Sequence, residues 1–208
     1  MRLWIFAFSV IWGLIACTPP NTDLPVSPTD SPIHLIKEDV EIGLQSPDSW
    51  HAYVTDENIV LICDDDKAEN MVINIWIPGL DMSDDVSFTD VVNDIASNIE
   101  SEHELHVTRP TTITWGGHDA AYFLLANEDS ATMILVVHVA NDTVIAFNIR
   151  GVDSDFSTLR PHLAEIFETI TINNMTPGSD VLVAIPDTLL LPSVNPETSL
   201  DPSAEPGQ

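Results

Sequence analysis

Short apolar runs separated by turn residues fill residues 33–173, and this spacing constrains the fold more than any other feature of the chain. Apolar and polar residues alternate over residues 40–44 and again over 50–54, with Ser46-Pro47-Asp48 as a turn between them. A period of two is typical of strands with one buried face. The pattern therefore predicts a sheet protein of one domain, a size that a single core can support.

Two more strands are expected before the middle of the chain. Residues 59–63 form a continuous apolar run, which predicts a strand buried on both faces. Residues 71–77 form the next strand, which Pro78-Gly79 should end. The run Asp64-Asp65-Asp66 between the two strands is predicted as a turn.

The second half of the chain combines helices with hairpins. Ser87 is a suitable N-cap for a helix over residues 87–102, and a second helix should open at Asp155. The apolar residues of each helix recur on one face: Val91, Val92, Ile95 and Ile99 in the first, and Leu159, Leu163, Ile166, Phe167 and Ile170 in the second.

Two hairpins are expected between these helices. One joins residues 107–115 to 118–126 through Gly116-Gly117, and the other joins 133–140 to 143–149 around Asn141-Asp142. The predicted fold class is therefore α+β, an antiparallel β-sheet with helices packed on it.

The N-terminal segment has the features of a cleaved leader. Residues 3–15 are nearly all apolar but fall short of the roughly 20 residues that a membrane-spanning helix needs. The run Leu14-Ile15-Ala16-Cys17 resembles a bacterial lipobox, which implies a signal peptide over residues 1–16 and a diacylglycerol on the Cys17 thiol. The alternatives are an ordinary secretory signal cut near Ala16 and an uncleaved anchor.

Both ends of the mature chain have the composition of unpacked segments. Residues 17–32 are rich in Pro, Ser, Thr and Asp and are predicted as a flexible tether, and residues 174–208 are predicted as a Pro-rich acidic tail, largely disordered. Residues 181–185 and 189–191 are too apolar for a fully solvated tail. They lie either against the domain or against a partner.

Three segments carry a resemblance to a known family: Ser46-Pro47-Asp48-Ser49-Trp50, Trp115-Gly116-Gly117-His118-Asp119-Ala120-Ala121, and the late helix ending in Ile170-Thr171-Ile172. Together they resemble the PsbP and DcrB group of domains. The resemblance covers roughly residues 39–173 and implies an α/β/α sandwich. It also implies a non-enzymatic accessory role beside membrane complexes, with no catalytic or metal-binding residue to carry over.

The charge of the chain limits its partners. There are 33 acidic residues against 6 Lys and Arg, a formal net charge of -27. This charge disfavours nucleic acid and anionic lipid surfaces as partners. It fits a solvated extracytoplasmic surface, an acid- or salt-adapted habitat, or a surface complementary to a basic partner.

Aspartate clusters raise the question of a calcium site, because Ca²⁺ takes several oxygen ligands. The weak candidates are Asp64, Asp65 and Asp66 in one predicted turn and Asp81, Asp84 and Asp85 in the loop before the first helix. Neither cluster has the spacing of an EF-hand loop. Exposed turn aspartates that cap backbone donors are the ordinary explanation for both clusters, and no cofactor is otherwise expected.

Other site chemistry is weakly represented. The histidines are His34, His51, His103, His106, His118, His138 and His162. His103 and His106, beside Glu102 and Glu104, could supply part of a transition-metal site, but surface histidines fit the same pattern. Cys63 lies in an apolar strand and is predicted as a core residue. Without a nucleophile motif, a P-loop or a dinucleotide fingerprint, we expect no enzyme.

These observations favour a lipid-anchored extracytoplasmic accessory or binding protein that docks to a protein or membrane complex. The alternatives are a cation- or small-ligand-binding lipoprotein and, less favoured, a hydrolase with an unfamiliar motif. Beyond the membrane that holds the lipid on Cys17, a protein partner is expected and nucleic acid is not. An external cell surface and a periplasmic membrane face remain equally open.

Overall fold

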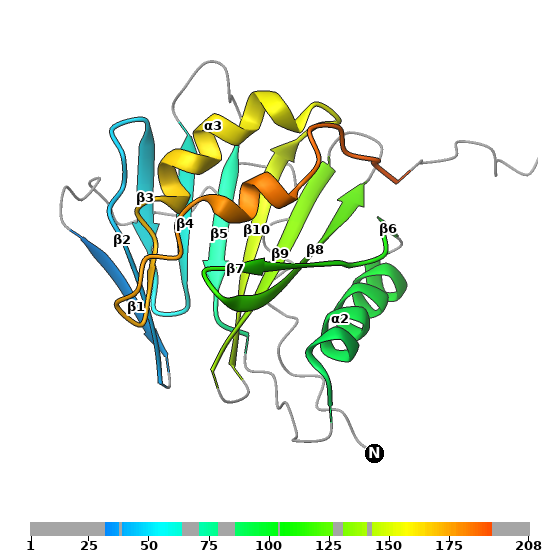
Figure 1. Cartoon of the computed structure of the whole chain (residues 1–208), viewed down its shortest axis with the longest axis horizontal. Coiled ribbons are helices and arrows are strands. Elements are labelled where there is room, and N and C mark those ends of the chain that lie inside the picture. The colour runs from blue at the N-terminus through cyan, green and yellow to red at the C-terminus, as the bar shows by residue number, and fades with distance from the viewer. Residues whose placement is uncertain are drawn as a thin grey trace, which may run out of the picture.

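The computed structural model describes residues 32–37, 39–63, 71–78, 86–103, 105–126, 131–140 and 143–192. The predicted leader, tether and lipid-bearing Cys17 lie outside this part and remain predictions. The described elements, shown in Figure 1, are β1 (Ile33–Lys37), β2 (Val40–Leu44), β3 (Trp50–Val54), β4 (Asn58–Cys63), β5 (Val72–Trp76), α2 (Phe88–His103), β6 (His106–Val107), β7 (Thr111–Trp115), β8 (His118–Ala126), β9 (Ala131–Ala140), β10 (Thr143–Val152), α3 (Phe156–Phe167), β11 (Thr171–Ile172) and the 3-10 helix η3 (Asp180–Ala184).

Two antiparallel sheets form the scaffold. The larger one has the strand order β3-β4-β5-β10-β9-β8-β6, and β7 also pairs with β8. The smaller one has the order β1-β2-β11. The two longest strands, β9 and β10, form the predicted hairpin at the centre of the large sheet and extend further than expected, to Ala131 and Val152.

The central strands are buried on both faces because a helix packs on each side. Tyr122, Leu135 and Phe147 point toward α3 and join the main core, which also contains the buried sides of β1 to β5. Alternate residues such as Phe123 and Val136 point to the other face, where they form a second cluster with α2. This arrangement confirms the predicted α+β class, with helices on both faces of an antiparallel sheet.

The start of α2 follows the predicted capping chemistry. The Ser87 hydroxyl accepts a hydrogen bond from the Asp90 backbone N–H at 3.2 Å and donates one to the Asp90 carboxylate at 2.7 Å. The contacts satisfy a backbone donor that has no partner within the helix. The buried stripe consists of Val92, Ala96 and Ile99, with Val91 and Ile95 packed beside it.

The turn at residues 46–49 carries the chain from one sheet to the other, since β2 belongs to the small sheet and β3 is an edge strand of the large sheet. The Trp50 N–H donates to the Pro47 carbonyl at 2.9 Å, and the Ser46 hydroxyl donates to the Trp50 carbonyl at 2.6 Å. Both backbone groups of Trp50 are thereby satisfied at the sheet edge. The Ser46 hydroxyl therefore has a structural role in this turn, and the Trp50 side chain is buried in the main core.

Three local predictions are wrong. β4 is an alternating strand in which Ile59, Leu61 and Cys63 are buried and the residues between them are half-exposed. The single strand expected over residues 107–115 is broken at 108–110, because Pro110 has no N–H for the ladder. The last helix ends at Phe167, and residues 171–172 form β11, which pairs with β2.

The boundary expected at residue 173 is also too early, because the packed chain continues beyond it. Val181, Leu182, Ile185 and Leu189 are buried in the main core. Figure 1 shows this C-terminal segment, residues 174–192, lying beside α3 on the same face of the large sheet. Of the two possibilities that the sequence left open for residues 181–185, packing against the domain is the observed one. Residues 193–208 lie outside the described part.

The C-terminal segment is seated by a close backbone approach at the β7–β8 turn. Gly116 has φ +55, and a Cβ there would lie 2.4 Å from the Cβ of Pro177. Beside it, the Trp115 indole N–H donates to the Gly178 carbonyl at 2.6 Å. Gly117 has φ +85, but a Cβ there would meet nothing within 4 Å. The first glycine therefore supplies space as well as backbone freedom, and the second supplies only freedom.

These two glycines provide a matched test of that seat. We expect Gly117→Ala to cost roughly 1–2 kcal/mol of unfolding free energy, because alanine is strained at positive φ. Gly116→Ala should cost more, roughly 2–4 kcal/mol, because it adds the overlap with Pro177 to a similar strain. Urea denaturation of both variants measures the difference. An equal loss of unfolding free energy in both variants would contradict close packing of Gly116 against Pro177.

Candidate docking surface

The acidic residues proposed as calcium ligands are not tested by the structure. Asp64, Asp65, Asp66, Asp81, Asp84 and Asp85 all lie outside the described residues. Within the described ranges, no three His, Cys, Asp or Glu side chains come together in a group that could hold a metal ion. The calcium site therefore remains a prediction.

The histidines are distributed over separate elements. His34 of β1 contacts the Glu41 carboxylate of β2 at 2.8 Å, and the His138 ring of β9 stacks on Phe88 with centroids 5.8 Å apart. His106 is exposed on β6, and the side chain of His103 lies outside the described part, as do those of Glu102 and Glu104. The pairing of His103 with His106 is consequently untested.

A buried thiol and a small surface hollow are two further features that could form a site. Cys63 is a buried thiol of the main core, as its apolar strand predicts. A hollow of ≈ 130 Å³ between α2 and the link after β6 is lined by residues that include Asn93, Ser97, Glu100 and Arg109. Pockets for organic ligands usually have about 300–1,000 Å³. This hollow is therefore too small for a ligand of that kind.

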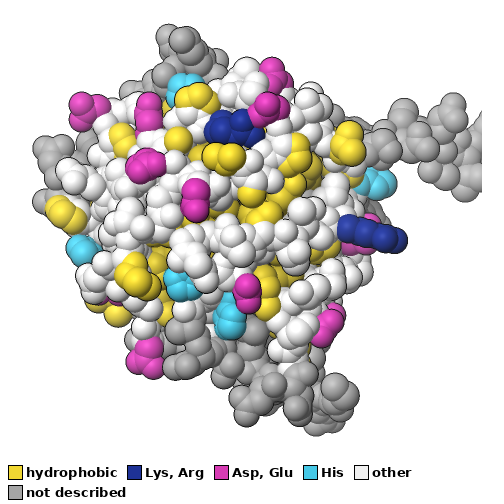
Figure 2. Space-filling model, viewed as in Figure 1, with side chains coloured by type: hydrophobic (Ala, Val, Ile, Leu, Met, Phe, Trp, Pro, Cys, Tyr) yellow, Lys and Arg dark blue, Asp and Glu magenta, His cyan; other side chains and the backbone are white. Residues whose placement is uncertain are grey.

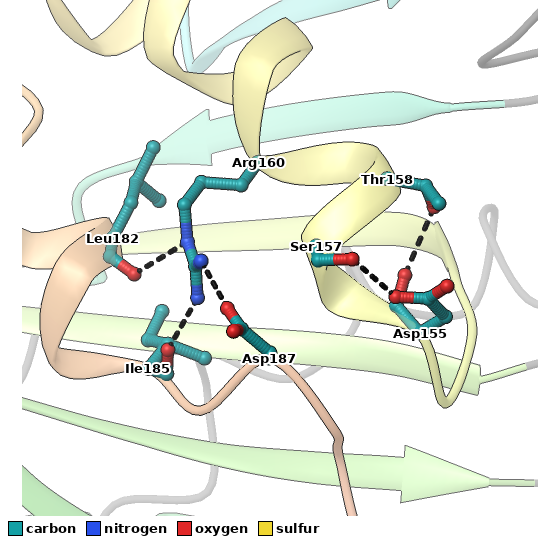
Figure 3. A network of polar contacts seen from close by, with 7 residues as sticks. All are labelled: Asp155, Ser157, Thr158, Arg160, Leu182, Ile185 and Asp187. Atoms are coloured by element: carbon teal, nitrogen blue, oxygen red, sulfur yellow. Dashed lines mark hydrogen bonds and ion pairs between the residues drawn. The ribbon is translucent and has the colours of Figure 1, made fainter.

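The most distinctive polar arrangement is the one that holds the C-terminal segment on α3 (Figure 3). The Arg160 guanidinium donates from Nε to the Leu182 carbonyl at 3.1 Å and from Nη2 to the Ile185 carbonyl at 2.6 Å. Its Nη1 forms an ion pair with the Asp187 carboxylate. One side chain thus binds three acceptors on either side of the η3 C-terminus, a geometry that the planar fork of arginine makes possible.

Backbone contacts extend this attachment to the start of α3. The Phe156 N–H donates to the Asp187 carbonyl at 2.8 Å, and the Leu189 N–H donates to the Ser154 carbonyl at 2.9 Å. Asp155 in turn accepts the Ser157 hydroxyl at 2.5 Å, as Figure 3 shows. The segment is therefore held at both ends of the 182–189 stretch.

Two aliphatic side chains project from this fixed segment into solvent. Val183 is 79% exposed and Leu190 is 85% exposed, although their neighbours Leu182 and Leu189 are buried. Figure 2 shows acidic side chains spread over this face with apolar ones between them. We define the docking face as Val183 and Leu190 with the exposed carboxylates of Glu165, Glu168, Asp180 and Asp187.

Basic side chains do little to offset this negative surface. Arg160 is occupied by the C-terminal segment, and the Lys37 ammonium donates to the Ile77 carbonyl at 2.8 Å. Among the Lys and Arg of the described part, Arg109 is the one whose residue is classed as exposed. The docking face therefore presents carboxylates and aliphatic groups to the solvent.

The sequence indicated part of this surface. The apolar character of residues 181–185 and 189–191 marked them as exceptional within a Pro-rich tail, but the pattern could not separate buried from exposed members. The role of Arg160 was missed. The sequence did contain a signal for it: the chain has 6 Lys and Arg, so a single arginine on a predicted helix stands out.

Comparison with known proteins finds similar folds and no close relative. No family model and no curated protein matches the chain. The solution structure of cyanobacterial PsbP from Synechocystis sp. PCC 6803 is similar with a TM-score of 0.44 and 10% identity, over 63% of this chain and 86% of that one.

A second similar structure is LpqN, involved in cell envelope biogenesis of Mycobacterium tuberculosis. The TM-score is 0.41 and the identity 16%, over 68% of this chain and 89% of that one. The first comparison names the group that the sequence segments resemble, and similarity at this level carries no functional assignment. Among the described helices, none is long and apolar enough to cross a membrane.

The attachment of the C-terminal segment can be tested at Arg160. We expect Arg160→Met to destabilise the protein by about 2–4 kcal/mol, because hydrogen bonds from a charged donor to the Leu182 and Ile185 carbonyls are lost. Asp187→Asn should cost less than about 1 kcal/mol, since the carboxylate is 70% exposed. Hydrogen exchange should show faster exchange of the Leu189 amide in the Met variant. Unchanged exchange there would contradict the attachment.

Proposed function

We propose that the protein is a lipid-anchored, extracytoplasmic accessory domain that docks onto a protein or membrane complex through the docking face. The observation that carries this proposal is the exposure of Val183 and Leu190 on a segment that Arg160 fixes and whose other large apolar residues are buried at Val181, Leu182, Ile185 and Leu189. The proposal includes no enzymatic activity.

The rigidity of the segment makes its two exposed side chains suited to binding. Association costs free energy for every loop and side chain that must be ordered, so a segment already held in place loses less on binding. Single exposed aliphatic residues are common on protein surfaces. Here both belong to one short segment, and the carboxylates of Asp180 and Asp187 on the same segment give the face a polar rim.

The partner is expected to present apolar and basic groups. Carboxylates on the docking face and the net charge of -27 would repel an acidic surface and favour encounter with a basic one. The same charge argues against nucleic acid and anionic lipid headgroups. A protein partner at the membrane fits these conditions best.

The anchor supplies the location in this proposal. A diacylglycerol on Cys17 would place two acyl chains in the membrane, the regime of stable attachment. Residues 18–32 would then hold the domain within reach of membrane complexes and raise its effective concentration beside them. The proposal applies equally to an external cell surface and to a periplasmic face.

The proposal is tested by crosslinking the anchored protein in its own cells, purifying it and identifying partners by mass spectrometry. A Cys17→Ser form serves as the unanchored control. We expect a reproducible membrane-complex partner that is recovered with the native form and lost or strongly reduced with the control. Recovery of the same partner at the same yield from the unanchored form would contradict a role for the lipid anchor in binding.

The docking face is tested separately by Val183→Asp and Leu190→Asp. Each change adds a charge to an exposed apolar contact, so recovery of the crosslinked partner should fall roughly 10-fold or more for a contact worth 1.4 kcal/mol or more. The melting temperature should stay unchanged because both side chains are exposed. Ile36→Asp on β1, where the side chain is 67% exposed, is the matched control and should keep the partner. Equal recovery from all three variants would place the contact elsewhere.

A further inference from the structure

One edge of the small sheet is formed by β1, and the register shows where its backbone groups point. Glu41 of β2 faces β11, because its N–H donates to the Asn173 side chain at 2.9 Å and its carbonyl accepts the Asn173 N–H at 2.8 Å. Successive residues of an antiparallel strand direct their backbone groups to opposite sides. Val40, Ile42 and Leu44 therefore face β1.

The same alternation decides which groups of β1 point away from the sheet. Ile33, Leu35 and Lys37 lie opposite the three β2 residues that face β1, so their backbone groups bond to β2. The N–H and C=O of His34 and Ile36 point to the other side, where no strand of the described part pairs with them. His34 is exposed and Ile36 is 67% exposed, whereas Ile33 and Leu35 are buried. The β1 edge is therefore open to solvent.

The other sheet edges are protected in ways that the β1 edge is not. At β3, both backbone groups of Trp50 are bonded within the preceding turn. β11 has two residues, and Ile172 exchanges two hydrogen bonds with Met175. β6 also has two residues, and β7 contacts η3. An open edge is a template for pairing with another strand, which proteins usually prevent by shortening, covering or charging it. β1 has five residues, and the ammonium of its Lys37 is bonded to a carbonyl after β5.

The charges around β1 favour a second copy of this chain as the strand that covers the edge. The chain has 33 acidic residues, but none of them lies in β1. On the solvent face of the small sheet, the Glu41 carboxylate contacts His34 Nδ1 at 2.8 Å. If two copies pair through β1, their Glu41 residues are three strand spacings apart, about 14 Å. This exceeds the screening length of about 8 Å at physiological ionic strength, so the two Glu41 carboxylates do not oppose one another.

We propose that two copies of the protein pair through β1 in antiparallel orientation and join their small sheets into one. A two-fold axis at Leu35 places His34 of each copy opposite Ile36 of the other copy. Each such pair exchanges two hydrogen bonds, because both residues direct an N–H and a C=O to this edge. The exposed Ile36 side chain gains the His34 ring as a cross-strand neighbour. The docking face does not include β1 and is separate from this interface.

Sedimentation equilibrium of the purified protein at concentrations up to about 1 mM tests the self-association. We expect a reversible monomer–dimer equilibrium that shifts toward the dimer as salt is added, because salt screens the net charge of -27 on each copy. A basic strand of another protein would bind more weakly at high salt instead. A protein that stays monomeric at every protein and salt concentration would overturn the proposal.

Hydrogen exchange locates the interface without any substitution. The His34 and Ile36 amides should exchange about twofold more slowly when half of the copies are paired, since paired amides are protected. The Leu35 amide bonds to β2 and should exchange at a rate that does not depend on protein concentration. A dimer that leaves the His34 and Ile36 rates unchanged would overturn pairing through β1. Protection of these amides only after another protein is added would assign the edge to that partner and overturn self-pairing.

Ile36→Pro and Ile36→Thr form a matched pair of variants. Proline removes one outward N–H and leaves every N–H that bonds to β2, a position at which edge strands tolerate proline. Its dimer dissociation constant should rise roughly 10-fold or more, because one hydrogen bond per copy is lost. Threonine keeps the N–H and the branched side chain, so its dissociation constant should stay within about threefold of the native value. Melting curves show that each variant is folded. Equal dissociation constants for the two folded variants would overturn the backbone pairing.

Discussion

The double burial of the β8, β9 and β10 strands is the constraint on which the rest of the structure depends. Antiparallel sheets can leave one face in water, but here Phe123 and Val136 on one side and Leu135 and Phe147 on the other are all excluded from solvent. Two layers must therefore cover the sheet. α2 covers one end of one face, and α3 with the C-terminal segment covers the other. The docking face is a product of this arrangement, because it belongs to the layer formed by α3 and the C-terminal segment.

The aromatic cluster beneath α3 shows how the second layer is fixed. Trp115 packs against Phe147 and Phe167 with ring centroids 5.3 and 4.9 Å apart, so a hairpin end, a central strand and a helix meet at one point. The Trp115 indole N–H donates a hydrogen bond to the Gly178 carbonyl. Buried indole N–H groups usually find such a partner, and the Trp50 Nε1 of this protein is buried without one. The C-terminal segment therefore supplies a hydrogen-bond acceptor for a buried indole and also contributes apolar side chains to the core.

The sequence predicted the elements that have a clear period. The strands at 40–44 and 50–54, the N-cap at Ser87 and the β9–β10 hairpin follow from alternation, capping and turn residues, and they were found. The predictions from sequence failed where residues distant along the chain determine the local structure. Whether Val60 and Ile62 are covered depends on what packs above β4, and whether residues 171–172 continue a helix or join β2 depends on the small sheet. Local composition contains neither fact.

The surfaces to which we assign functions were predicted less well for the same reason. The acidic composition predicted an acidic surface, but the outward direction of the His34 and Ile36 backbone groups depends on the β2–β11 register, which joins residues far apart in the chain. Likewise, the arginine that fixes the C-terminal segment cannot be recognised until residues 182–187 are placed beside α3. The predicted lipid anchor is the opposite case, since that prediction rests on a short local motif at Cys17 and on nothing in the fold.

If the chain is exported, as the proposed function requires, the position of Leu189 far along the chain has a consequence for folding. The main core is not closed until that residue packs and its N–H reaches the Ser154 carbonyl. A chain that passes through a membrane channel with its N-terminus first would therefore have to bring Leu189 across before its core can close. Because a channel of that kind accepts unfolded chains, dependence on the segment around Leu189 would delay folding until that segment has been translocated. The C-terminal segment would in this way keep the chain competent for export.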